Sequence, residues 1–84
     1  MYTVYILLCR DRTLYTGITT DPSRRLQEHK AGKGGHYTRT HKALRMVYTE
    51  KAKDRSLASK REAQIKHLPR AEKLHLISRS KKIP

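Results

Sequence analysis

The chain has 84 residues, and 20 Lys and Arg against 7 Asp and Glu give a formal net charge of +13 at pH 7. This length predicts one small domain over residues 1–84, which buries only roughly 60% of its unfolded surface. The single Cys9 excludes a disulfide framework and a four-cysteine zinc site, and the longest apolar stretch is too short to span a bilayer. We therefore expect a reducing, cytoplasmic location without a signal peptide or membrane association.

The positive charge predicts a polyanionic partner, because so strong a field repels itself in the compact state. Residues 51–84 hold 11 basic and 3 acidic side chains and residues 1–50 hold 9 and 4, so the C-terminal third is expected to contact phosphates more strongly. Nucleic acid is the leading candidate. An anionic membrane is the weaker alternative, because the expected helices lack the apolar face that interfacial insertion needs.

Two apolar segments, residues 2–9 and 14–20, are separated by a short polar stretch and predict a β-hairpin. Asp21 and Pro22 then predict the start of a helix over residues 22–31 that ends before Gly32. Residues 32–41, GKGGHYTRTH, contain three Gly and no hydrophobic periodicity, so we expect a mobile surface loop there.

Residues 44–49 predict a third strand, and a helix capped by Asp54 is expected to end at Pro69. Its apolar stripe comprises Leu57, Ala58, Arg61, Ile65 and Leu68. A last helix is expected from about Arg70, followed by a loose basic tail at residues 79–84. The apolar face of that helix comprises Ala71, Leu74 and Ile77. The order β-β-α-β-α-α predicts an α+β fold with helices flanking a three-stranded antiparallel sheet.

The chain contains Thr3-Val4-Tyr5, Tyr15-Thr16-Gly17 ten residues later, Ser23 to His29 with Arg25 inside it, and Glu62 in the later helix. In their order and spacing, these segments resemble the GIY-YIG nuclease superfamily. Residues 4–33, 61–66 and 70–74 are similar, more narrowly, to the small stand-alone bacterial members of the UPF0213 type. The resemblance covers nearly the whole chain and implies the GIY-YIG endonuclease fold.

The resemblance implies hydrolysis of phosphodiesters with one divalent metal ion, Mg²⁺ or Mn²⁺, held by Glu62. Mg²⁺ needs only one or two carboxylates when water and phosphate oxygens complete its shell. A two-metal mechanism is disfavoured, because the other carboxylates are spread over turns and several elements. The ordinary alternative for Glu62 is a solvated ion pair with Lys66, four residues later.

Tyr5 and Tyr15 correspond to the two motif tyrosines, one a candidate general base and the other an orienting partner for the attacking water. A phenol needs nearby positive charge to act as a base near neutral pH. The two rings share one face of the hairpin only if paired residues have an even index sum, which a turn with an odd number of residues gives. Taken alone, either tyrosine is better explained as a core residue, and only the joint pattern favours the site.

Arg25 and His29 lie four residues apart and are expected to share a helix face, where Arg25 holds phosphate oxygens. His29 is interpreted as a donor to the phosphate or the leaving oxygen, with a plain surface histidine as the alternative. Gly17 would leave room for phosphate or metal beside the tyrosines. The expected nucleic-acid contacts are Gly17, Lys33, Tyr37, Arg39, Lys42, Arg61 and Lys66.

The sequence thus predicts a monomeric DNA endonuclease, a nickase that is structure-selective or non-specific, with any sequence specificity supplied by a partner protein. Its affinity would be mostly electrostatic and would fall with salt. A nucleic-acid-binding module of the same fold with little or no turnover is the alternative, favoured by the absence of any Asn, which many family members place downstream of the glutamate. A third reading is a ribosome-associated protein that prefers RNA.

Overall fold

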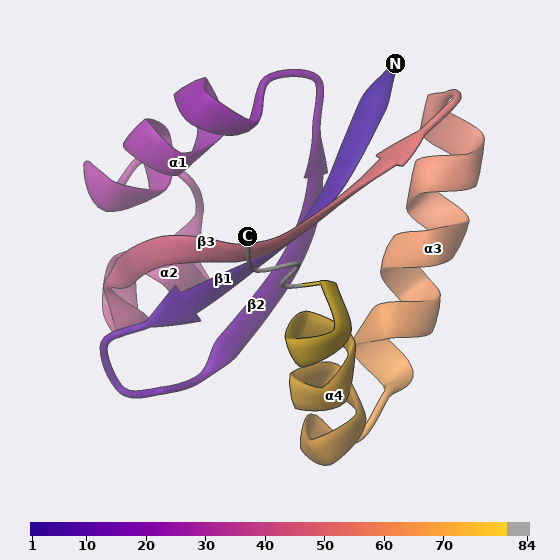
Figure 1. The fold of residues 1–84 in the computed structure, drawn as a ribbon. Helices are drawn as coiled ribbons and strands as arrows, with labels where there is room; N and C mark the ends of the chain where they lie inside the picture. Colours follow the sequence, from indigo (N-terminus) through magenta and orange to yellow (C-terminus); the bar gives the residue numbers. More distant parts are fainter. Residues whose placement is uncertain (81–84) are drawn as a thin grey trace.

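The computed structural model describes residues 1–80, whose elements follow in the order β1, β2, α1, α2, β3, α3 and α4 (Figure 1). Strands β1 (Tyr2–Cys9), β2 (Leu14–Thr19) and β3 (Ala43–Ala52) form an antiparallel sheet in the order β2-β1-β3. The α+β class and the three-stranded sheet flanked by helices are therefore confirmed. No helix within these residues is both long and apolar enough to cross a bilayer.

The β1–β2 turn sets the register of the hairpin. The N–H of Cys9 donates to the carbonyl of Thr13 at 2.9 Å, so residues 10–12 link the two paired ends. Tyr5 is paired with Gly17, and Leu7 with Tyr15. The even index sum required by the tyrosine motif is thus confirmed, and both phenols lie on the same face of the sheet.

The helix boundaries follow the capping residues read from the sequence. Asp21 starts α1 (Pro22–Lys30), and Asp54 starts α3 (Arg55–His67), each accepting a hydrogen bond from the backbone N–H three residues later, at 3.2 and 2.9 Å. Pro69 separates α3 from α4 (Arg70–Ser80). Residues 79 and 80 therefore continue a helix, which corrects their assignment to a loose tail, and residues 81–84 lie outside the described part of the chain.

The glycine-rich segment contains a short helix that the sequence did not predict. α2 (His36–His41) lies where a mobile loop was expected over residues 32–41. Its formation depends on tertiary contacts. Its own Thr38 is buried, and the Arg10 N–H donates to the carbonyls of His41 and Lys42, at the end of the helix, at 3.2 and 2.8 Å. Strand β3 also extends beyond the expected residues 44–49, to Ala43–Ala52.

Alternate residues of β1 face two different layers. Val4 and Ile6 join the apolar core under α3 and α4, whereas Tyr5 points to the side occupied by α1 and α2 (Figure 1). The core cluster comprises Val4, Ile6, Tyr48, Ala58, Ile65 and Ile77. The expected apolar stripes were partly wrong: Leu57 and Leu74 are 48% and 44% exposed, because the helices rest on the sheet through neighbouring positions.

Candidate active site

Tyr5 and Tyr15 line the sheet face that supports α1 and α2. Tyr5 is only 1% exposed, whereas Tyr15 is half-buried and its hydroxyl makes no hydrogen bond within residues 1–80. The Tyr15 ring packs edge-on against His29 and stacks on Tyr37, with centroid distances of 5.5 and 5.4 Å. The Tyr15 hydroxyl is thus the more accessible of the two phenolic groups.

Gly17 accommodates the phenol of Tyr5 and does not leave an open space. A Cβ atom at position 17 would lie 2.5 Å from the Tyr5 hydroxyl oxygen, a distance that real contacts do not reach. The room expected there for phosphate or metal is therefore filled by Tyr5 itself. This finding corrects the assignment of Gly17 as a nucleic-acid contact and gives the glycine a packing role on the edge strand β2.

His29 is buried and connects two hydroxyl groups. Its Nε2 lies 2.8 Å from the Tyr5 hydroxyl, and its Nδ1 lies 2.7 Å from the Thr38 hydroxyl. Both ring nitrogens are therefore engaged, and the ring is 1% exposed. His29 is therefore not a surface histidine, because it lies directly behind Tyr5. It has no ring nitrogen left to donate to a phosphate, because Tyr5 and Thr38 occupy both.

The protonation state of His29 follows from its burial. Desolvation, aided by the positive charge of Arg25, lowers the pKa of His29 from 6.5 to about 4, while Glu28 opposes this shift. The ring is thus neutral near pH 7, with one nitrogen donating and the other accepting. The neutral imidazole can accept a hydrogen bond from one of the two hydroxyls, Tyr5 or Thr38, and donate one to the other.

This lowered pKa predicts a pH dependence of stability. Because the unfolded chain binds a proton at His29 below about pH 6.5 and the folded chain only below about pH 4, the free energy of unfolding should fall by up to about 3 kcal/mol as pH drops through that window. Urea unfolding at pH 7 and pH 4.5 measures the difference. His29→Gln should flatten it, and an unchanged slope in that variant would contradict the assignment.

Arg25 ties the glycine-rich segment to α1 and lies beside the Tyr5 phenol. Its guanidinium donates to the Glu28 carboxylate and to the Gly34 carbonyl, both at 3.0 Å. Burial raises the pKa of Tyr5, Arg25 opposes the rise, and the charges of Tyr15 and Glu62 add to it. The pKa of Tyr5 therefore depends on three nearby side chains, namely Tyr15, Arg25 and Glu62.

The backbone of Gly34 lies directly against the His29 ring. A Cβ atom there would lie 2.1 Å from Nδ1 of His29, so only glycine lets the backbone pass so close to the ring. Arg25 also lines a hollow of about 320 Å³ at the start of β1 and the end of β2, together with Arg24, Glu28 and Arg55. Glu28 offsets part of the charge of Arg24 and Arg25 at its wall.

Glu62, on α3, is the carboxylate expected to hold a metal. Its side chain is 22% exposed and pairs with Lys66 Nζ at 3.2 Å, so the ordinary ion pair anticipated from the sequence is present. Residues 1–80 contain no cluster of three or more Asp, Glu, His or Cys that would enclose an ion. The donor set fits an open Mg²⁺ or Mn²⁺ site, with one carboxylate and the remaining positions taken by water and phosphate oxygens.

Two of the expected nucleic-acid contacts are engaged within the protein. Arg61 Nε donates to both oxygens of Glu50, at 3.0 and 3.1 Å, and the Glu50 carboxylate also accepts from Tyr48. Lys66 is paired with Glu62 as described. The nearest carboxylates offset part of the charge of these cations, and their contact with nucleic acid stays a prediction.

The remaining expected nucleic-acid contacts lie in α2 or close to it in the sequence. Tyr37 is sandwiched between Tyr15 and His41, with a centroid distance of 4.1 Å to His41, so neither face of its ring is open for stacking on a base. Lys33, Arg39 and Lys42 are exposed. Tyr37 therefore positions α2, and the three exposed cations stay available to a ligand.

Sequence reasoning missed Thr38, Glu28 and the close approach at Gly34. Glu28 carried a readable signal, because it lies three residues after Arg25 on one helix. Thr38 carried none, since it lies in a polar segment without periodicity and meets His29 only in the folded chain.

Comparison with known proteins places these residues in a family. The model of the GIY-YIG catalytic domain matches residues 1–75. A UPF0213 protein from Syntrophus aciditrophicus is 50% identical over 92% of this chain and 90% of its own, and one from Natronomonas pharaonis is 48% identical over 89% and 88%.

Solved structures agree with this assignment. The solution NMR structure of a UPF0213 protein from Bacillus halodurans has a TM-score of 0.62 at 41% identity, covering 98% of this chain and 88% of that one. A second NMR structure, from E. faecalis, has a TM-score of 0.61 at 43% identity, covering 92% and 82%. The chain therefore belongs to the GIY-YIG nuclease family and, within it, to the small UPF0213 proteins.

Proposed function

We propose that this protein is a DNA endonuclease that nicks branched, nicked or single-stranded regions, or DNA without preference, using one divalent ion at Glu62. The main support is the cluster in which the Tyr5 hydroxyl meets neutral His29, with Arg25 and Glu62 near enough to affect the pKa of Tyr5. The net charge of +13 supports binding to phosphates. The protein would act as a cytoplasmic, single-domain monomer, with specificity added by a partner protein.

The two tyrosines would divide the work on the attacking water. The Tyr15 hydroxyl, which has no partner within residues 1–80, would orient the water. The Tyr5 oxygen would accept a hydrogen bond from the water while its own hydroxyl donates to Nε2 of the neutral His29 ring. The hydrogen bond to Thr38 would hold the ring in the orientation that accepts from Tyr5.

Arg25 and Glu62 would act on the phosphate. GIY-YIG nucleases generally use divalent metal ions, and an ion bound at Glu62 would stabilise charge on the phosphate and leaving oxygens. Arg25, fixed by Glu28 and the Gly34 carbonyl, would bind a phosphate oxygen from the wall of the 320 Å³ hollow. Lys66 would release Glu62 when the more highly charged ion binds.

Nicking of supercoiled plasmid in Mg²⁺ or Mn²⁺ tests the proposal. The wild type and Glu72→Ala, which removes an exposed glutamate of α4, should both convert the plasmid to the open circle. Glu62→Ala should not, although its affinity for DNA in EDTA should match that of the wild type. An intact plasmid with wild-type protein in both metals would contradict the enzymatic proposal.

The pairing of Glu62 with Lys66 and the absence of Asn favour a second candidate, a nucleic-acid-binding module with little or no turnover. This candidate predicts that Glu62→Ala changes neither the plasmid nor the affinity. Competition between duplex DNA and RNA tests the ribosome-associated reading, which requires RNA preference and no effect of metal.

A further inference from the structure

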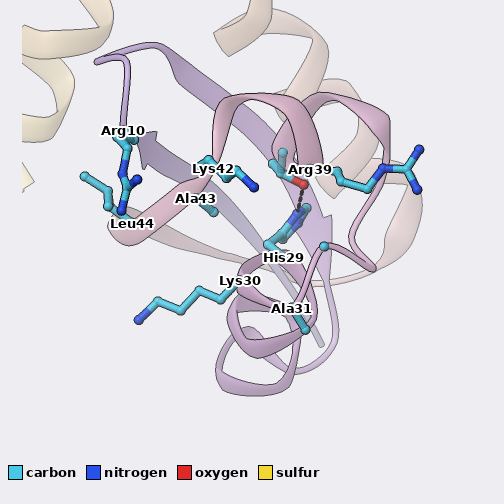
Figure 2. Close-up of a pocket in the computed structure, with 10 residues that line it drawn as sticks. Arg10, His29, Lys30, Ala31, Arg39, Lys42, Ala43 and Leu44 are labelled. Atoms are coloured by element: carbon cyan, nitrogen blue, oxygen red, sulfur yellow. Dashed lines mark hydrogen bonds between the residues drawn. The ribbon is translucent and has the colours of Figure 1, made fainter.

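A basic hollow lies on the far side of His29 from Tyr5. It has a volume of about 380 Å³ and opens between the end of α1, α2 and the start of β3 (Figure 2). Four basic side chains surround it, namely Arg10, Lys30, Arg39 and Lys42. Figure 2 shows Arg10 and Lys30 on one side and Arg39 on the opposite side, with the His29 ring between them. None of the described residues that line the hollow is acidic.

A second hollow, of about 400 Å³, shares two wall residues with this one. Arg10 and Leu44 line both, and the second hollow adds Arg12 and Arg70. We call the two together the basic trough. It passes from the end of α1 across the tip of the β1–β2 hairpin to the start of α4, and its cations are Arg10, Arg12, Lys30, Arg39, Lys42 and Arg70.

The cations of the trough have no anionic partner in the described chain. Arg24, Arg25, Arg61 and Lys66 are each paired with a glutamate. No ion pair within residues 1–80 includes a cation of the trough. Asp11, in the hairpin turn, is held by His41 and Thr13. Uncompensated like charges around a concave surface favour the binding of an anion.

The backbone fixes these cations at a conformational cost. Lys42 has a φ of 63°, in the left-handed region that favours glycine. Its carbonyl accepts a hydrogen bond from the Arg10 N–H at 2.8 Å, which holds the two cations on adjacent segments. The strained backbone thus holds Lys42 at the wall of the hollow, next to Arg10.

We propose that the basic trough binds the phosphodiester backbone of a nucleic-acid strand, beside the reacting phosphate. No tyrosine lines either hollow, so the trough offers cations and not stacking faces, and it recognises the backbone without reading bases. Since His29 contacts Tyr5 and also borders the trough, the strand would continue from the active site past α2. We assign this path to a single-stranded arm of the substrate, a step that rests on the proposed function and not on the lining of the trough.

Matched pairs of lysine variants test the trough in the full chain. Lys30→Gln with Lys42→Gln removes two charges from it, and Lys51→Gln with Lys60→Gln removes two from exposed positions elsewhere. Affinity for a labelled single-stranded oligonucleotide is measured in EDTA at several salt concentrations. The trough pair should bind more weakly, and its slope of log affinity against log salt should be shallower by about 1.4.

The control pair should keep a slope close to that of the wild type. Equal losses in both pairs would overturn the trough as a site and leave only a diffuse positive field. Lys42→Gly adds an independent measurement, because it should bind more weakly without loss of thermal stability. Single-stranded DNA, RNA and duplex arms identify the strand, and a clear preference for duplex would contradict the single-stranded arm.

These binding measurements need no turnover. If the plasmid stays intact but the trough pair loses affinity selectively, the nuclease proposal fails and the trough proposal stands. If nicking is observed but the two pairs behave alike, the trough proposal fails alone.

Discussion

Tyr5→Phe is expected to lower the rate of plasmid nicking by about 10²–10⁴-fold, the range usually lost with a general acid–base group. The variant removes the hydroxyl that lies 2.8 Å from Nε2 of His29, so the oxygen that would accept from the attacking water is lost. Single-turnover nicking at saturating protein isolates this loss from binding. Leaving a buried ring nitrogen unpaired should also cost about 1–3 kcal/mol, which thermal unfolding measures.

Tyr15→Phe is the matched control for the division of roles. Its hydroxyl makes no hydrogen bond within the described residues, so this variant should keep the stability of the wild type and lose less activity than Tyr5→Phe. A larger loss of nicking in Tyr15→Phe would reverse the roles and make Tyr15 the proton acceptor.

Gly34→Ala is expected to destabilise the fold by about 3 kcal/mol, because its methyl group would lie 2.1 Å from Nδ1 of His29. The ring cannot retreat without breaking its hydrogen bonds to Tyr5 and Thr38. For a domain of this size, such a loss is a large part of the total stability. Urea unfolding at pH 7 measures it.

Gly35→Ala separates the clash from backbone strain. Gly35 has a φ of 126°, and no other side chain or backbone segment lies within 4 Å of the place that a Cβ atom would take, so alanine there should cost about 1–3 kcal/mol from backbone strain alone. In a His29→Ala background the effect of Gly34→Ala should shrink, since the ring is gone. Full additivity of the two substitutions would contradict the proposed contact.

The elements with local signals were predictable from the sequence. The hairpin, the helix starts at Asp21 and Asp54, and the break at Pro69 each depend on residues near one another in the chain. Helix α2 was not predictable, because its polar sequence has no periodicity and it forms around the contact between Thr38 and His29.

The candidate site was predictable in its members but not in their partners. The even index sum placed Tyr5 and Tyr15 on one face, and the four-residue spacing placed Arg25 and His29 near them. Nothing local distinguished Arg61, which is bound by Glu50 on β3, from the unpaired cations of the trough. That distinction depends on carboxylates far away in the sequence.

The pairing of Tyr5 with Gly17 also constrains how the hairpin can assemble. A slip of one position would set Tyr5 opposite Thr16 or Ile18, whose side chains leave no gap for the phenol, and would turn Tyr15 toward the opposite layer. Misaligned hairpins are thereby penalised before the helices dock. The residue that shapes the reaction centre thus also selects the correct strand alignment as the chain folds.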